Sequence, residues 1–92
     1  MKISNDLYIT CSTIKGIEKK TVHNTLIKLS KNSYNIKKIQ KISGSNLYCI
    51  RASINYRIIL KKDHDQNFMV VDIIDKRREQ SINNKINNLI RI

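Results

Sequence analysis

The sequence predicts an α+β fold, in which an N-terminal helix or helical hairpin packs on a small antiparallel β-sheet (a meander) and is followed by a C-terminal helix. Three patterns predict this. Apolar residues recur at three- and four-residue steps in residues 12–31, alternate in short runs between residues 47 and 75, and return to helical spacing in residues 81–92. The 92 residues contain no internal repeat and no Ser- or Gly-rich linker, so we expect a single domain over residues 1–92.

The N-terminal part is expected to contain a strand and then a helix. Residues 7–11 are β-branched and aromatic, and Leu7, Ile9 and Cys11 share one face at a period of two, which predicts a first strand. Further along, the apolar spacing becomes that of a helix, with Ile14, Ile17, Val22, Leu26 and Leu29. We expect Gly16 to separate a short turn from a longer helix, and the polar cluster of residues 32–35 to end it.

The second half predicts three strands and a helix. A basic connector, residues 36–42, leads to a turn at residues 43–46. Strands are then expected at residues 47–52, 56–61 and 68–75, and their short polar connections predict pairing in sequence order. The final helix places four apolar residues on one face, namely Ile82, Ile86, Leu89 and Ile90.

The charge of the chain indicates a polyanionic partner. Eighteen Lys and Arg against seven Asp and Glu give a net charge of +11 and a pI near 10.0. Such a charge favours nucleic acid or an anionic membrane surface, although a genome rich in Lys, Asn and Ile would also raise it. The terminal helix has a mostly neutral Asn face, which disfavours membrane binding. With neither a signal-peptide pattern nor a spanning apolar run, we expect a cytoplasmic protein.

Arginines are expected to gather on one face of the sheet. Strand alternation and hairpin pairing place Arg51 and Arg57 side by side, opposite the core face. The third strand leaves through Lys76-Arg77-Arg78, and we expect Arg77 or Arg78 to reach the same face, with no carboxylate between the arginines. Guanidinium groups donate paired hydrogen bonds to phosphate, so this cluster suits binding of a phosphate or stabilisation of its charge. The alternative is an ordinary solvated face.

Three runs of residues resemble the RelE/ParE toxin superfamily. They are Leu47-Tyr48-Cys49-Ile50-Arg51, then Asn55-Tyr56-Arg57-Ile58-Ile59-Leu60, then an apolar strand ending in Lys76-Arg77-Arg78-Glu79. Members of this superfamily show a Leu-aromatic opening, a Tyr-Arg one hairpin later, and a Lys-Arg or His-Arg after the last strand, all preceded by an N-terminal helix. The similarity covers about the last half of the chain, and it implies that residues 1–92 are a single RelE-like toxin domain.

The resemblance implies the toxin of a type II toxin–antitoxin system. In the RelE branch, which we favour, the activity is that of an endoribonuclease that cuts messenger RNA in the ribosomal A site and inhibits translation. Carried over by position, Arg57 stabilises the scissile phosphate, Arg77 assists it, and Arg51 adds a basic group on the adjoining strand. We expect Arg78, Lys76, Lys41 and Lys38 to contact nucleic acid as well. The implied partner is an acidic antitoxin in a hetero-oligomer, which covers the basic face or displaces the terminal helix.

The resemblance leaves the proton-transfer groups open. Asn83 stands where the RelE branch has Tyr, and Cys49 stands where it has a second basic residue. Cleavage needs a group to accept a proton and one to supply it, and Arg provides neither. The substitutes that the chain offers are Glu79, His64, Tyr34 and Tyr48. Neither a cofactor nor a metal is expected, because Cys11, Cys49, His23 and His64 lack metal-site spacing.

Two other functions compete with a ribonuclease. The ParE branch resembles the same fold but poisons DNA gyrase, and its N-terminal helices are usually longer than residues 12–31 allow. A small basic RNA- or DNA-binding protein unrelated to toxins is the third reading. It would have few aromatic side chains for base stacking, since alternation places Tyr48 and Tyr56 on the core side.

Overall fold

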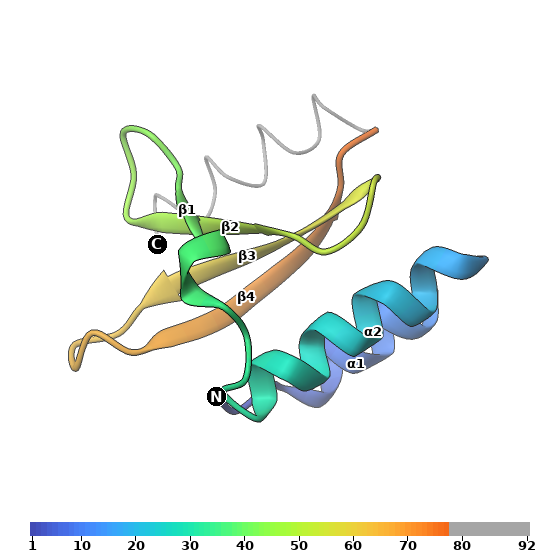
Figure 1. The fold of residues 1–92 in the computed structure, drawn as a ribbon, viewed down its shortest axis with the longest axis horizontal. Helices are drawn as coiled ribbons and strands as arrows, with labels where there is room; N and C mark the ends of the chain where they lie inside the picture. Colours follow the sequence, from blue (N-terminus) through green and yellow to red (C-terminus); the bar gives the residue numbers. More distant parts are fainter. Residues whose placement is uncertain (78–92) are drawn as a thin grey trace.

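The computed structural model describes residues 1–77, which form two helices on a four-stranded sheet (Figure 1). The helices are α1 (Asn5–Ser12) and α2 (Ile17–Ser30), followed by a short 3-10 helix, η1 (Ile36–Lys38). The strands are β1 (Gln40–Lys41), β2 (Leu47–Arg51), β3 (Tyr56–Lys62) and β4 (Phe68–Asp75), antiparallel in the order β1-β2-β3-β4. The predicted α+β fold is confirmed, while the helix predicted for residues 81–92 lies outside the described residues.

Residues 7–11 belong to helix α1, so the prediction of a first strand is wrong. Leu7 and Cys11 are four residues apart, which puts them on one face of a helix as well as one face of a strand. Both are buried, whereas Ile9, which a strand would place beside them, is 62% exposed. Asp6 in the first turn suits the positive end of the helix dipole. The chain therefore opens with a helical hairpin, α1 and α2.

Gly16 lies directly before α2, where the sequence predicts a break, but the segment before it contains helix α1 and not only the expected short turn. Its φ of +75° is a left-handed backbone that glycine adopts without strain, and α2 starts at the next residue. Val22, Leu26 and Leu29 form the buried stripe of α2, while Ile17 at its start is 87% exposed. These three residues are separated by steps of four and three residues, as a helix with one apolar face requires.

The sheet contains one strand, β1, that the sequence does not predict. The three predicted strands are present within one residue of their expected ends, and part of the basic connector forms β1, which pairs with β2 through Gln40↔Cys49 and Lys41↔Tyr48. A two-residue strand is too short to show an alternating pattern. A register irregularity between Ile59 and Leu60 also shifts the pairing of β3 with β4.

The two faces of the sheet bury different apolar clusters. The face toward the helices packs Ile50, Ile58, Leu60 and Ile73 against the buried stripes of α1 and α2. The other face buries a smaller cluster of Leu47, Ile59 and Ile74. Among the described residues, no helix is both long enough and apolar enough to span a membrane.

Candidate nucleic-acid interface

Arg51 and Arg57 lie directly opposite each other where the β2–β3 hairpin closes. They form the last register pair of the two strands, next to the Ile50↔Ile58 pair that faces the helices. Alternation therefore turns both arginines to the face that lies away from α1 and α2. Like charges directly opposite on neighbouring strands destabilise a sheet. We call these two residues the arginine pair, and a bound anion would relieve their repulsion.

The guanidinium of Arg57 is anchored by one nitrogen to the hairpin loop. Its Nη1 donates to the carbonyl oxygens of Ser53 at 2.8 Å, Tyr56 at 3.0 Å and Ile54 at 3.4 Å. Among residues 1–77, Nε and Nη2 have no hydrogen-bond partner, and Arg51 has none at all. A guanidinium recognises phosphate through two parallel N–H groups, which is what the Nε–Nη2 edge of Arg57 offers. The loop thus holds Arg57 without using that edge.

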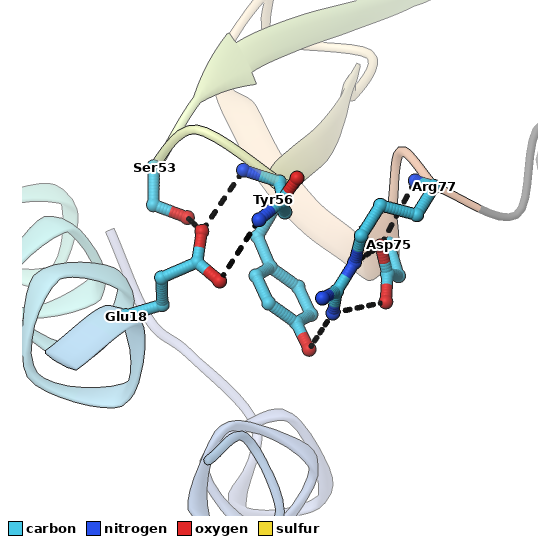
Figure 2. A network of polar contacts seen from close by, with 6 residues as sticks. Glu18, Ser53, Tyr56, Asp75 and Arg77 are labelled. Carbon is cyan, nitrogen blue, oxygen red and sulfur yellow. Dashed lines mark hydrogen bonds and ion pairs between the residues drawn. The ribbon is translucent and has the colours of Figure 1, made fainter. Parts of the chain in front are cut away.

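Helix α2 holds the same loop from the opposite side, as Figure 2 shows. The Glu18 carboxylate accepts hydrogen bonds from Ser53 Oγ at 2.9 Å, the Asn55 backbone N–H at 2.9 Å and Asn55 Nδ2 at 3.2 Å. The backbone bond from Asn55 is the main cause that lowers the pKa of Glu18. The loop is therefore fixed between a carboxylate on the helix and a guanidinium on the sheet, which restricts where Arg57 can move.

Arg77 does not join the arginine pair, contrary to expectation. Its Nε and Nη2 bond the Asp75 carboxylate at 3.0 and 2.8 Å, and its guanidinium carbon is 5.8 Å from the centre of the Tyr56 ring (Figure 2). The hydrogen bonds and charge of Asp75 raise the pKa of Arg77. Asp75 pairs with Tyr56, whose ring packs against the helix-side core, whereas Arg57 pairs with Ile74 on the other face. The ion pair with Asp75, two residues earlier in the chain, keeps the Arg77 side chain on the helix side of the sheet.

The predicted lysines also lie apart from the arginine pair. Lys38 is exposed in η1, and Lys41 is exposed on β1, opposite Tyr48. Lys76 is exposed directly after β4, and its backbone N–H donates to the Asn55 carbonyl at 2.6 Å. Arg78 lies outside the described residues. Of the predicted site residues within residues 1–77, the structure brings together only Arg51 and Arg57.

Asp72 lies on the face of the arginine pair, so the expectation of a face without carboxylates is wrong. It pairs with Ile59, two positions along from the Arg57↔Ile74 pair, and residues two apart on a strand share a face. Its Oδ1 accepts the backbone N–H of Ile73 at 2.8 Å. The sequence carries a signal for Asp72, because it is an acidic residue in the middle of a strand whose other residues from Phe68 to Ile74 are apolar.

The predicted substitutes for proton transfer are scattered. Tyr34 is half-buried, and burial raises its pKa, with a smaller contribution from Cys49. Tyr48 packs edge-on against Phe68 on the helix side, and His64 is exposed at the β3–β4 tip. Glu79 and Asn83 lie outside the described residues. None of Tyr34, Tyr48 and His64 shows a hydrogen bond to Arg57 within residues 1–77.

Cys49 shares the strand face of Arg51, two residues away. Burial raises the pKa of its thiol, and the positive charge of Arg57 opposes this less strongly. At neutral pH the thiol is therefore protonated, and it adds no charge to the site. Its partial burial places it at the margin of the Leu47, Ile59 and Ile74 cluster.

The site can therefore hold a phosphate group on the sheet face that lies away from α1 and α2. Arg57 supplies an oriented pair of donors, Arg51 a second positive charge, and Asp72 a carboxylate on the same face. In residues 1–77, no group of His, Cys, Asp and Glu has the arrangement of a metal site. Comparisons of the chain with protein-family models, curated proteins and solved structures return no match.

Proposed function

We propose that this protein is a RelE-like toxin that binds messenger RNA on the ribosome and cleaves it. The observation that carries the proposal is the arginine pair, with the Nη1 of Arg57 bound to the hairpin loop and its Nε–Nη2 edge free of partners within residues 1–77. Two positive side chains held side by side, without an ion pair between them and the described carboxylates, fit a polyanion better than a structural role.

In the proposed reaction a ribose 2′-OH attacks the adjacent phosphorus and the bond to the 5′ oxygen breaks. The 2′ oxygen forms the new bond to phosphorus, giving a cyclic phosphate, and its proton passes to a base. The 5′ oxygen takes up a proton from solvent water as its bond to phosphorus breaks, and it leaves as a hydroxyl group. Negative charge grows on the non-bridging oxygens, where the Nε–Nη2 edge of Arg57 stabilises it. Arg51 holds the neighbouring phosphate. Asp72 is our candidate for the base, because it is the carboxylate that shares this face within residues 1–77.

Partner and location follow from the same proposal. A cytoplasmic toxin that cuts messenger RNA must be held inactive, and the arginine pair is the surface that an acidic antitoxin would neutralise. Binding of such a partner would be strongly salt dependent, because exposed charges are screened by added salt. An acidic open reading frame next to the gene is the simplest genetic observation in favour of this pairing.

The deciding experiment adds purified protein to translating ribosomes and maps the 5′ ends of the products. Cuts at fixed codon positions are expected with the native protein and are expected to be lost in Arg57→Ala. Lys28→Ala is the matched control, since it also removes one positive charge, from an exposed position on helix α2. Unchanged cutting in a folded Arg57→Ala variant would overturn the assigned role. No cutting by the native protein would overturn the ribonuclease proposal.

A gyrase-directed toxin of the ParE type is the second candidate. The observation that favours it is the helical hairpin of α1 and α2, which replaces the strand and helix predicted from the sequence. A gyrase poison needs a binding surface and no proton-transfer groups, and few such groups lie beside Arg57. A supercoiling assay run beside the ribosome assay separates the two candidates, because inhibition of gyrase without cleavage of messenger RNA selects the ParE type.

A further inference from the structure

A polar cleft lies at the end of the sheet away from the arginine pair. It has a volume of about 670 Å³ and lies between the β1–β2 loop and the tip of the β3–β4 hairpin. Both of these connections are at one end of the sheet, and the β2–β3 loop is at the other (Figure 1). We call it the loop-end cleft. Its volume falls in the range of sites that hold small organic ligands.

Lys62 in this cleft is held in place by aromatic rings. Its Nζ is 5.3 Å from the centre of the Tyr48 ring and 5.1 Å from that of Phe68, and the two rings meet edge-on at 84° with their centres 5.0 Å apart. An ammonium held against aromatic faces leaves its hydrogen-bond donors unused, whereas in an ion pair the carboxylate accepts from those donors and offsets the positive charge. Lys62 therefore presents an oriented ammonium group to the cleft.

A second lysine lines the same cleft. Lys41 is exposed and directly opposite Tyr48 in the register of β1 with β2. Within residues 1–77, neither Lys41 nor Lys62 forms an ion pair. The lining carboxylate, Asp63, turns its Oδ1 to the backbone N–H groups of Asp65 at 2.8 Å and Asn67 at 3.0 Å, where it shapes the hairpin tip. The two ammonium groups are therefore available to an anion.

The remaining lining is suited to a nucleobase. Asn46 and Gln66 are exposed and carry amides, which both donate and accept hydrogen bonds and so match base edges. Tyr48 offers an aromatic surface beside them. Ser45, by contrast, is used by the turn itself, since its Oγ donates to the Ile42 carbonyl and accepts the Leu47 N–H. Positive charge, an aromatic ring and amides together are the chemistry of single-stranded RNA recognition.

We propose that the loop-end cleft binds an unpaired RNA segment, with Lys41 and Lys62 on its phosphates and Tyr48 against a base. The RNA class rests on the function proposed above, while the cleft is a separate site. Lys62 is five residues beyond Arg57 along β3, roughly 17 Å, and alternation puts the two on opposite faces of the sheet. The cleft would thus anchor nucleotides that flank the scissile phosphate.

The test measures binding of the full chain to a six-nucleotide RNA whose 2′ oxygens are methylated so that it cannot be cut. With Lys62→Ala or Tyr48→Leu we expect affinity to fall roughly tenfold by fluorescence anisotropy. Amide NMR signals of Gly44, Asn46 and Gln66 should shift during the titration. Lys28→Ala is the control for loss of one charge, and Tyr48→Phe keeps the ring and should bind as the native protein does.

The outcomes separate this proposal from the ribonuclease proposal. An Arg57→Ala variant that no longer cuts messenger RNA but still shows shifts at Gly44, Asn46 and Gln66 supports a distinct second site. The loop-end cleft is rejected if Lys62→Ala binds no more weakly than Lys28→Ala. Equal affinity for a duplex of the same length rejects it too, since a base buried in a duplex cannot reach Tyr48. Thermal unfolding of Tyr48→Leu verifies that the variant is folded.

Discussion

Reversing the charge of Arg51 should stabilise the protein and weaken its binding to RNA. Arg51 faces Arg57 in the register of β2 with β3, so Arg51→Glu replaces a repulsion by an attraction. Charged pairs directly opposite on neighbouring strands are worth about 0.2–1 kcal/mol, and solvent screening of the exposed Arg51 keeps the total at about 0.5–1 kcal/mol. In a domain of this size that raises Tm by about 2–8 °C.

Thermal unfolding at low salt, followed by circular dichroism, measures the change in Tm. Arg51→Gln removes the repulsion without adding an attraction, so about half of the rise is expected. Lys20→Glu, an exposed reversal on α2, corrects for the lower net charge of the whole chain. The difference between Arg51→Glu and Lys20→Glu should nearly vanish in about 1 M salt, where the screening length is about 3 Å. A Tm for Arg51→Glu no higher than that of Lys20→Glu at low salt would refute the reasoning.

Three further predictions concern the loop, the site and the helical hairpin. Arg57→Lys should lower single-turnover cleavage on ribosomes by about 100-fold, because an ammonium cannot both bond the loop carbonyls and offer a paired edge; a loss under threefold contradicts this. Glu18→Gln should be less stable than the native protein at pH 7. Folding lowers the pKa of Glu18, so the ionised carboxylate stabilises the protein above the unfolded-state pKa, and this stabilisation is lost as pH falls through the folded-state pKa. A stability difference between Glu18→Gln and the native protein that stays constant from pH 7 to pH 3 would contradict this prediction. Gly16→Ala should cost about 1 kcal/mol by urea unfolding, since φ is +75° although nothing lies within 4 Å of an added Cβ; an unchanged midpoint would argue against backbone strain.

The arginine pair could be predicted from the sequence because it depends on local rules. Strand alternation fixes the face of each residue, and the short loop between the strands fixes which residues oppose each other. Both rules act over a few residues, and the register of β2 with β3 agrees with them at Arg51 and Arg57. The position of Arg77 could not be predicted from these local rules. It depends on an ion pair with Asp75, and the irregularity beside Ile59 alters the alternation of side chains along β4.

Helix α1 shows why an apolar pattern alone is insufficient in a short segment. The four-residue spacing of Leu7 and Cys11 fits both a helix and a strand, so the contacts that these residues make in the folded protein select between the two. As a helix, α1 buries both residues against α2 and the sheet and leaves Ile9 in solvent. The loop-end cleft likewise joins residues from β1, β2 and β3 with two connecting loops, and no spacing in the chain indicates their proximity.

The α+β class, the three longer strands, the break at Gly16 and the opposition of Arg51 to Arg57 are predictable from the sequence, because each follows from periodicity or backbone preference over a few residues. Four features emerge only in the folded protein: the helical state of residues 7–11, the pairing of β1, the separation of Arg77 from the arginine pair and the hydrogen bonds of Glu18 to the hairpin loop. These features depend on burial, strand pairing and side-chain contacts in the folded protein, which outweigh the preferences of the local sequence.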